Sequence, residues 1–382
     1  MNVHGTCDSR FDDLREIFTD NIASGEECGA ALAIDVDGDL VVDLWGGHRD
    51  AARTLPWERD TIVNVWSTTK EVTALAVLLL ADRGLLDLDA PVATYWPEFA
   101  AAGKEAVTVT HLMSHTSGVA GWDQPIVTSD LYDWDLSTSR LAGQAPWWEP
   151  GTASGYHLIN YGHLLGEVVR RVTGKHLKTF VADEIAGPLG TDLQIGAGPA
   201  DDHRIAELIP PPPLTEIPPM SPDAPAFKAF TGPAVVAEDA NTVPWRRADI
   251  GGANGHSTAR ALARTLSVIA RGSVGDPASG TGLTLSPATI GRIFEEQSHG
   301  VDLVLGVPLR FGIGFALPET TSVPYIPDGR ICYWGGYGGS QTVMVPEAKT
   351  TISYVMNKMG GELLGSARTS AYLTAAFAAL NA

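Results

Sequence analysis

The stretch GAALAIDVDGDLVVDLWGG, residues 29–47, has the pattern of two apolar β-strands joined by an Asp-Gly turn. Asp-Gly between two strand-like runs is a strong hairpin signal, because a tight turn of this kind needs positive φ at both central residues. Far along the chain, ICYWGGYGGSQTVMVPEAKTTISYVMN, residues 331–357, predicts at least two more strands with a turn at residues 346–349. We therefore expect a sheet that is built from both ends of the chain.

Helical patterns accompany these strands. Apolar residues recur at helical spacing from Phe11 to Ile22, and the chain closes with a helical pattern over roughly residues 363–380. Between the two sets of strands the sequence predicts mostly helices and long loops. The expected organisation is an α/β lobe of residues 1–68 and 295–382, a mainly helical lobe of residues 69–294, and a binding cleft between the two lobes.

Composition limits the possible functions. The chain has 382 residues, of which 44% are hydrophobic and 19% are charged, as expected for a folded globular protein. Its formal net charge of −19 argues against nucleic acid and against an anionic membrane surface as partners, since both attract basic proteins. A small neutral substrate fits this surface better than a polyanion does.

The cysteines and the N-terminus predict a cytoplasmic protein. Cys7, Cys28 and Cys332 are an odd number without a C-x-x-C pair, which favours a reducing compartment. The first residues lack the basic and apolar regions of a secretory signal, and the longest apolar run, residues 74–81, is too short to span a bilayer. The oligomeric state is not predicted.

The stretch NVWSTTKEV, residues 64–72, holds a candidate nucleophile. A spacing of three places Ser67 and Lys70 on one helical face, close enough for a hydrogen bond. At a helix start the backbone N–H of Ser67 would point outward, and the helix dipole would favour negative charge there. An amine beside a serine can activate it as a nucleophile. The alternative is that Ser67 or Thr68 caps the helix and Lys70 reaches solvent.

Two further segments add possible chemistry. In WWEPGTASGYHLINYG, residues 147–162, Tyr156 lies before a predicted helix. A nearby ammonium would stabilise its phenolate, so Lys70 and Tyr156 would titrate as a coupled pair. Tyr156 could also be a packed loop aromatic, with Tyr161 as the second candidate for the base. The glycine-dense YWGGYGGSQTVMV, residues 333–345, allows close backbone approach to a substrate or forms a tight turn.

Taken together, these segments resemble the serine β-lactamase-like hydrolases, in particular the class C β-lactamase branch and, within it, the family VIII carboxylesterases. STTK is similar to the family's S-x-x-K, PGTASGY places the family's catalytic tyrosine at Tyr156, and WGG occupies the position of K-T-G. Lesser similarities lie at residues 111–119, 251–264 and 309–317. The resemblance implies a β-lactamase/penicillin-binding-protein-like α/β fold, in which helices flank an antiparallel sheet and a large, mainly helical insertion interrupts it.

Two departures from the family pattern shift the expected substrate. Tyr156-His157-Leu158 replaces the Tyr-x-Asn of class C lactamases, and Trp334 replaces the K-T-G lysine that helps to hold a substrate carboxylate. Tryptophan offers an apolar wall instead. The resemblance therefore implies a serine carboxylesterase that hydrolyses short- to medium-chain acyl esters through an acyl-enzyme, without a cofactor. A β-lactamase or D-Ala-D-Ala peptidase, or an acyltransferase on the same scaffold, is the alternative.

The resemblance also implies roles for residues. Ser67 attacks the ester, the pair of Lys70 and Tyr156 takes its proton, and the backbone N–H groups of Ser67 and Tyr337 hold the oxyanion. The candidate pocket residues are Trp66, Trp148, His157, Trp334, Gly335 and Gly336.

Three other features have competing interpretations. His111 and His115 are four apart but lack the glutamate of a zinc-binding H-E-x-x-H helix, so we expect no metal. Ser257 in GHSTA, a near miss to G-x-S-x-G, is a fallback nucleophile that we interpret as the cap of the next helix. The proline-rich residues 209–225 form either a surface excursion or a wall over the pocket.

Overall fold

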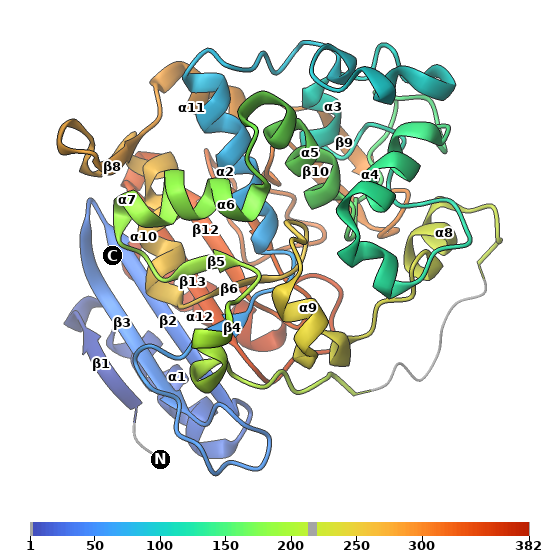
Figure 1. The fold of residues 1–382 in the computed structure, drawn as a ribbon. Coiled ribbons are helices and arrows are strands. Elements are labelled where there is room, and N and C mark those ends of the chain that lie inside the picture. Colours follow the sequence, from blue (N-terminus) through green and yellow to red (C-terminus); the bar gives the residue numbers. More distant parts are fainter. Residues whose placement is uncertain (1–2, 213–219, 382) are drawn as a thin grey trace.

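The computed structural model describes residues 3–212 and 220–381, and its framework is a six-stranded sheet (Figure 1). The strand order is β1-β3-β2-β13-β12-β11, and every neighbouring pair is antiparallel. The bounds are β1 (Val3–Cys7), β2 (Gly29–Val36), β3 (Asp39–Gly47), β11 (Cys332–Gly335), β12 (Gln341–Val345) and β13 (Thr350–Met356). The expected antiparallel sheet is therefore confirmed, and its strands come from the two ends of the chain.

The first hairpin forms as its sequence predicts. Asp37 and Gly38 join β2 to β3 with φ of 51° and 99°, the left-handed values that an Asp-Gly turn provides. At the other edge of β2, Ile34 faces Ile352 of β13. This pairing joins the N-terminal strands to the C-terminal strands.

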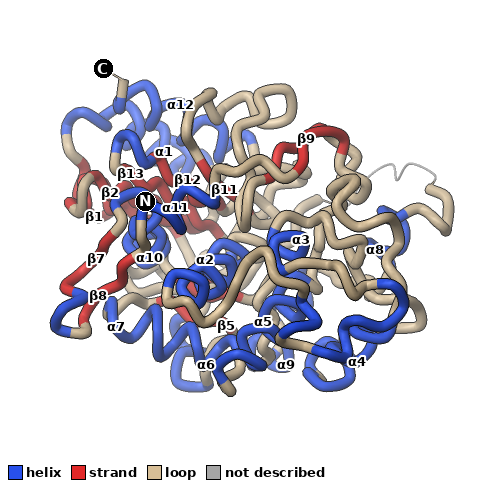
Figure 2. Tube along the Cα trace, turned by 90° about the horizontal axis from the view of Figure 1, so that it is seen from above, coloured by secondary structure: helices blue, strands red, loops and turns tan. Residues whose placement is uncertain are grey.

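Helices cover both faces of the sheet. Figure 2 shows the strands between α1 (Asp12–Ser24) and α12 (Ala367–Leu380) on one side and α10 (Ala259–Arg271) on the other. In α1 the buried residues are Leu14, Phe18 and Ile22, which are four apart and therefore lie on one face, as predicted. No helix within residues 3–212 and 220–381 is long and apolar enough to cross a membrane.

Residues between the two sets of strands form helices and three small sheets. The central helix is α2 (Thr69–Asp82), which is buried on nearly all sides and contacts α5, α6, α10, α11 and β11. The other helices are α3 (Val109–Met113), α4 (Trp134–Gly143), α5 (Tyr161–Thr173), α6 (Leu177–Val181), α7 (Gly187–Leu189), α8 (Pro225–Thr231), α9 (Val243–Arg247) and α11 (Pro287–Ile293). The small sheets are β4 (Val63–Asn64) with β6 (Gly255–Ser257) and β5 (Leu193–Ile195), β7 (Ser273–Asp276) with β8 (Thr281–Thr284), and β9 (Ser298–Val301) with β10 (Pro308–Phe311). The division into two lobes stays a prediction.

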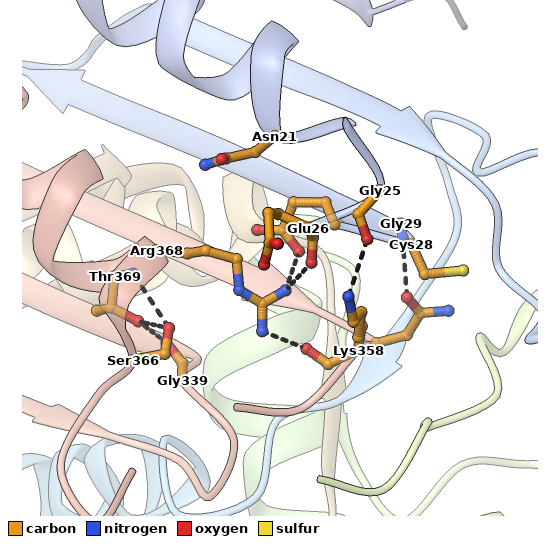
Figure 3. Close-up of polar contacts among 12 residues, drawn as sticks. Asn21, Gly25, Glu26, Cys28, Gly29, Gly339, Lys358, Ser366, Arg368 and Thr369 are labelled. Atoms are coloured by element: carbon orange, nitrogen blue, oxygen red, sulfur yellow. Dashed lines mark hydrogen bonds and ion pairs between the residues drawn. The ribbon is translucent and has the colours of Figure 1, made fainter. Parts of the chain in front are cut away.

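A buried ion pair anchors α12 to the loop that follows α1. Arg368 Nη1 lies 2.6 Å from Glu27 Oε2, and Arg368 Nη2 donates to the Lys358 carbonyl at 2.6 Å (Figure 3). One residue further along α12, Thr369 Oγ1 donates to the Gly339 carbonyl at 2.7 Å. The helix therefore also holds the glycine-rich turn between β11 and β12, which borders the site described next.

Candidate active site

Ser67 lies in a turn immediately before α2. The turn begins at Trp66, whose φ of +44° is unusual for a bulky residue, and the helix itself begins at Thr69. No side chain caps α2, because the Thr68 hydroxyl instead contacts the Ser340 hydroxyl at 3.0 Å. Thr68 therefore occupies the N-cap position of α2, but neither its side chain nor that of Ser67 makes a capping hydrogen bond.

Lys70 is buried and points at Ser67. Its Nζ lies 2.9 Å from Ser67 Oγ and donates to the carbonyls of Leu158 and Gly252, both at 2.7 Å. Only 2% of Lys70 is exposed, and burial holds its pKa well below the usual 10.5. A neutral amine has two N–H groups and one lone pair. With both N–H groups donated to the two carbonyls, a neutral amine here would have only its lone pair left for the Ser67 hydroxyl.

Tyr156 lies in the loop that precedes α5, with its ring next to the lysine. Lys70 Nζ is 4.7 Å from the centre of the ring, and the indole N–H of Trp334 donates to the Tyr156 hydroxyl at 2.7 Å. Burial raises the pKa of Tyr156 well above its usual 10, and the hydrogen bond from Trp334 offsets this only in part. The shifts of Lys70 and Tyr156 thus favour an amine and a phenol. The expected ammonium–phenolate pair is not favoured, since burial disfavours both charges.

Two backbone N–H groups near Ser67 are free to bind an oxyanion. Within the described part of the chain, neither the N–H of Ser67 nor that of Tyr337 donates a hydrogen bond. The N–H of Gly336 is already used, because it donates to the Ser340 carbonyl at 2.7 Å. A Cβ on Gly336 would lie 2.2 Å from the Val65 carbonyl oxygen, so only glycine allows this turn to approach the Ser67 segment so closely.

The aromatic candidates for the pocket fall into two groups. Trp66 packs against Trp245 and Tyr337, with ring centres 5.2 Å and 5.7 Å apart, beside the Ser67 turn. Trp334 lies over Tyr156, where it supplies a hydrogen-bond donor as well as the apolar wall expected from the sequence.

The other three candidates lie around the Tyr156 loop and the end of β11. Trp148 is half-buried and covers Gly155. His157 is fully buried, and its Nδ1 donates to the Gly155 carbonyl at 2.8 Å while its Nε2 accepts from Ser117 at 2.7 Å. Both ring nitrogens of His157 are therefore occupied by protein partners, and its place in the pocket stays a prediction. Gly335 ends β11 and is partly exposed.

Glu71 is a buried acid that the motifs did not single out. It follows Lys70 in α2, and its Oε1 accepts the backbone N–H of Trp334 at 2.9 Å. Burial raises the pKa of this carboxyl well above its usual 4.5. Glu71 joins the helix that follows Ser67 to the strand that precedes Tyr337, and only its position next to the S-x-x-K motif could have drawn attention to it.

Several sequence interpretations need correction or remain open. Ser257 lies inside β6 and donates to the Asp192 carbonyl at 3.0 Å, while Thr258 caps α10, so the interpretation of Ser257 as the cap is wrong. His111 belongs to the capping box of α3. No cluster of His, Cys, Asp or Glu in residues 3–212 and 220–381 is arranged to hold a metal ion. The proline-rich segment includes residues 213–219, which lie outside the described residues.

Comparison with known proteins gives relatives along nearly the whole chain. The family model "Beta-lactamase" matches residues 14–376. The "Esterase/beta-lactamase LipL" of Mycobacterium tuberculosis (strain ATCC 25618 / H37Rv) is 34% identical over 368 residues, which cover 94% of this chain and 83% of that protein.

Two solved structures have the same fold. A structure described as a family VIII carboxylesterase is 39% identical with a TM-score of 0.91, covering 99% of this chain and 100% of that one. A penicillin-binding protein homologue from Caulobacter crescentus is 38% identical with a TM-score of 0.89, at the same coverage.

Proposed function

The chain belongs to the beta-lactamase family and is a serine hydrolase, and from this premise we propose that it hydrolyses short- to medium-chain acyl esters through an acyl-enzyme on Ser67. The contact that supports this proposal most directly is the 2.9 Å distance between Lys70 Nζ and Ser67 Oγ. Because both N–H groups of the neutral amine are taken by carbonyls, its lone pair is available to accept the serine proton.

Acylation then follows from the geometry. Ser67 Oγ attacks the ester carbonyl carbon, and its proton passes to the Lys70 amine. The backbone N–H groups of Ser67 and Tyr337 receive the negative oxygen of the tetrahedral intermediate; one such donor is typically worth about 100-fold or more in rate. The Tyr156 phenol gives its proton to the leaving alcohol oxygen as the C–O bond breaks. The Lys70 ammonium returns a proton to Tyr156, so both groups regain their starting forms.

Deacylation uses the same groups for a water molecule. The Lys70 amine and the Tyr156 phenol, again neutral, relay the proton that the water loses as it attacks the acyl carbon. The Ser67 oxygen leaves and regains its proton, and the carboxylic acid is released. While the Tyr156 oxygen is charged, the Trp334 indole N–H at 2.7 Å stabilises it.

The substrate class follows from the neutral site. Trp334 presents an uncharged donor where related lactamases carry a lysine, so a substrate carboxylate lacks that partner. Among the relatives, LipL is described as both an esterase and a beta-lactamase, so β-lactam hydrolysis is the second candidate. Transfer of the acyl group to an alcohol other than water uses the same acyl-enzyme.

The location is also a proposal. Cys7, Cys28 and Cys332 are all free thiols in the structure. Free thiols are typical of a reducing compartment, which supports a cytoplasmic enzyme.

The decisive assay compares the purified protein with Ser67→Ala on p-nitrophenyl butyrate and on a chromogenic cephalosporin. We expect ester turnover that disappears in the variant, and little or no turnover of the cephalosporin. Ester turnover that survives Ser67→Ala would exclude Ser67 as the nucleophile.

A second variant tests the proton donor. Tyr156→Phe should slow acylation by several orders of magnitude while leaving the fold intact, because phenylalanine keeps the packing and loses the proton. Near-normal acylation would move the role to Tyr161, whose hydroxyl lies 3.4 Å from the Met113 carbonyl oxygen.

A further inference from the structure

Three consecutive backbone N–H groups of the Tyr156 loop donate hydrogen bonds to two residues, His115 and Asp302. Gly155 N–H donates to the His115 carbonyl at 2.9 Å, and His157 N–H donates to His115 Nδ1 at 3.2 Å. Between them, Tyr156 N–H donates to Asp302 Oδ1 at 3.0 Å. These bonds join the loop to residues 40 or more positions away in the sequence on each side.

We propose that His115 and Asp302 are positioning residues for ester hydrolysis, which hold the Tyr156 backbone so that its phenol stays within reach of Ser67 and Lys70. The inference rests on the proposed role of Tyr156 as the proton carrier. Neither residue touches the ester in this proposal. Both act through the loop.

His115 is held in the orientation that this role needs. It follows α3 with a φ of +63°, a left-handed conformation that a non-glycine residue keeps only where the surrounding structure imposes it. The ring is packed on several sides by aromatic rings. Their centres lie 4.8 Å (Tyr156), 5.1 Å (His157), 4.9 Å (Tyr161) and 4.9 Å (Phe311) from its own.

The same surroundings keep the ring an acceptor. Burial lowers the pKa of His115 well below 6.5. The ring is therefore neutral, with its proton on Nε2 and the lone pair of Nδ1 facing the His157 N–H.

Asp302 holds the loop from the other side. It is fully buried, and its Oδ1 accepts N–H groups from Tyr156, Val304 and Leu305 at 3.0, 2.9 and 2.9 Å. Leu303 N–H also donates to the Ser154 carbonyl at 2.9 Å. One carboxylate oxygen thus builds the 302–305 turn and fixes Tyr156 to it, and the negative charge of Asp302 also favours the protonated phenol.

The loop needs such external partners because α5 begins only at Tyr161, so Tyr156 has no helical hydrogen bonds of its own. Beyond the loop, the phenol is fixed by the Trp334 N–H. A displacement of about 1 Å of a reacting group can lower a rate by about 100-fold. Loss of a backbone anchor should therefore lower kcat much more than it weakens substrate binding.

The test pairs a deleting variant with a rescuing variant at each residue. His115→Gly removes the Nδ1 acceptor without a φ penalty, and His115→Asn keeps a side-chain acceptor and tolerates φ of +63°. Asp302→Ala removes the acceptor, and Asp302→Asn keeps Oδ1. His163→Gln is the control, because His163 is equally buried but bonds to the Leu131 carbonyl.

On p-nitrophenyl butyrate at pH 8, we expect His115→Gly and Asp302→Ala to lower kcat by about 100-fold with KM within about threefold. The kcat of each Asn variant should be at least tenfold higher than that of the deleting variant at the same position. The kcat of His163→Gln should match that of the parent protein. An equal decrease in kcat in the deleting and rescuing variants, or an increase in KM with kcat unchanged, would overturn the proposal.

A double variant separates this proposal from the proposed function. In a Tyr156→Phe background, His115→Gly should lower kcat by less than about threefold more, because its effect acts through the phenol. If Tyr156→Phe lowers kcat to a measurable residual rate and His115→Gly still lowers that rate by its full factor, the positioning proposal fails alone. If Tyr156→Phe retains normal activity, the proposed role of Tyr156 as proton carrier is refuted. The positioning proposal depends on that role and is then refuted as well.

Discussion

The hydrogen bond from Trp334 to Tyr156 gives a sharp prediction for catalysis. The perturbation is Trp334→Phe, which keeps an aromatic ring between Tyr156 and Phe311 but removes the indole N–H. The ring of Trp334 has its centre 4.9 Å from that of Tyr156 and 5.4 Å from that of Phe311, so phenylalanine retains part of this packing.

The expected decrease in kcat/KM follows from the loss of this one hydrogen-bond donor. The bond is 2.7 Å long and buried, and a buried oxygen that loses its partner costs about 1–3 kcal/mol. The cost lies toward the upper end in the transition state, because the Tyr156 oxygen becomes more negative as it gives up its proton. At about 1.4 kcal/mol per factor of ten, kcat/KM for ester turnover should fall about 5- to 150-fold.

The assay is steady-state turnover of p-nitrophenyl butyrate, with Trp245→Phe as the matched control. Trp245 is equally a buried indole, but its Nε1 has no partner among the residues that the structure describes. Trp245→Phe therefore makes a similar cavity without breaking a hydrogen bond to the reacting groups. If the two variants differ by less than about twofold in kcat/KM, the Trp334 N–H does not stabilise the reacting phenol and the reasoning is refuted.

Three more predictions concern charge and burial. Burial holds the pKa of Lys70 well below 10.5, and the neutral amine is lost as pH falls through that lowered pKa, so kcat/KM should fall with falling pH at a midpoint well below 10.5; a rise that begins only above pH 10 would contradict this. Burial also lowers the pKa of His163 to about 4, so below about pH 6.5 the unfolded chain binds a proton that the folded chain excludes, and stability falls as pH decreases. His163→Gln should remove about 2.5 kcal/mol of that fall between pH 7.5 and 4.5 in urea unfolding, and an unchanged fall would contradict it. Arg368→Met leaves Glu27 buried without its partner and should cost about 3–5 kcal/mol in the same assay, whereas a loss under 1 kcal/mol would show that the ion pair matters little.

Local patterns account for the elements that the sequence predicts correctly. The hairpin at residues 29–47 and the helix over Phe11–Ile22 depend on turn chemistry and apolar spacing, which are visible within twenty residues. The pairing of β2 with β13 joins residues about 320 positions apart, and no local signal specifies that register. The prediction that Ser257 caps α10 is wrong for a similar reason. Both serine and threonine are suitable cap residues, and the pairing of β6 places Ser257 in the strand and Thr258 at the cap.

The candidate active site shows the same contrast between contacts that local sequence predicts and contacts between distant segments. The contact between Ser67 and Lys70 is an i,i+3 pair, so spacing alone predicts it. The bonds of Tyr156 to Trp334 and Asp302, and the bond of His157 to His115, connect segments 42 to 178 positions apart. The directions in which the pKa values of Lys70 and Tyr156 shift could not be predicted from the motifs, because depth of burial is a property of the packed fold and of no single motif.

The uncharged state of both groups bears on the proposed choice of substrate. A carboxylate that enters the site must leave water without meeting a fixed positive charge, since Lys70 favours the neutral amine and Trp334 offers only a dipole. Burying such a charge without a partner costs several kcal/mol, which corresponds to a loss of at least a hundredfold in affinity. Asp302, which lies near enough to raise the pKa of Tyr156, repels the carboxylate as well. A neutral ester meets none of these costs, so the neutral form of Lys70 that the proposed mechanism requires would also disfavour acidic substrates.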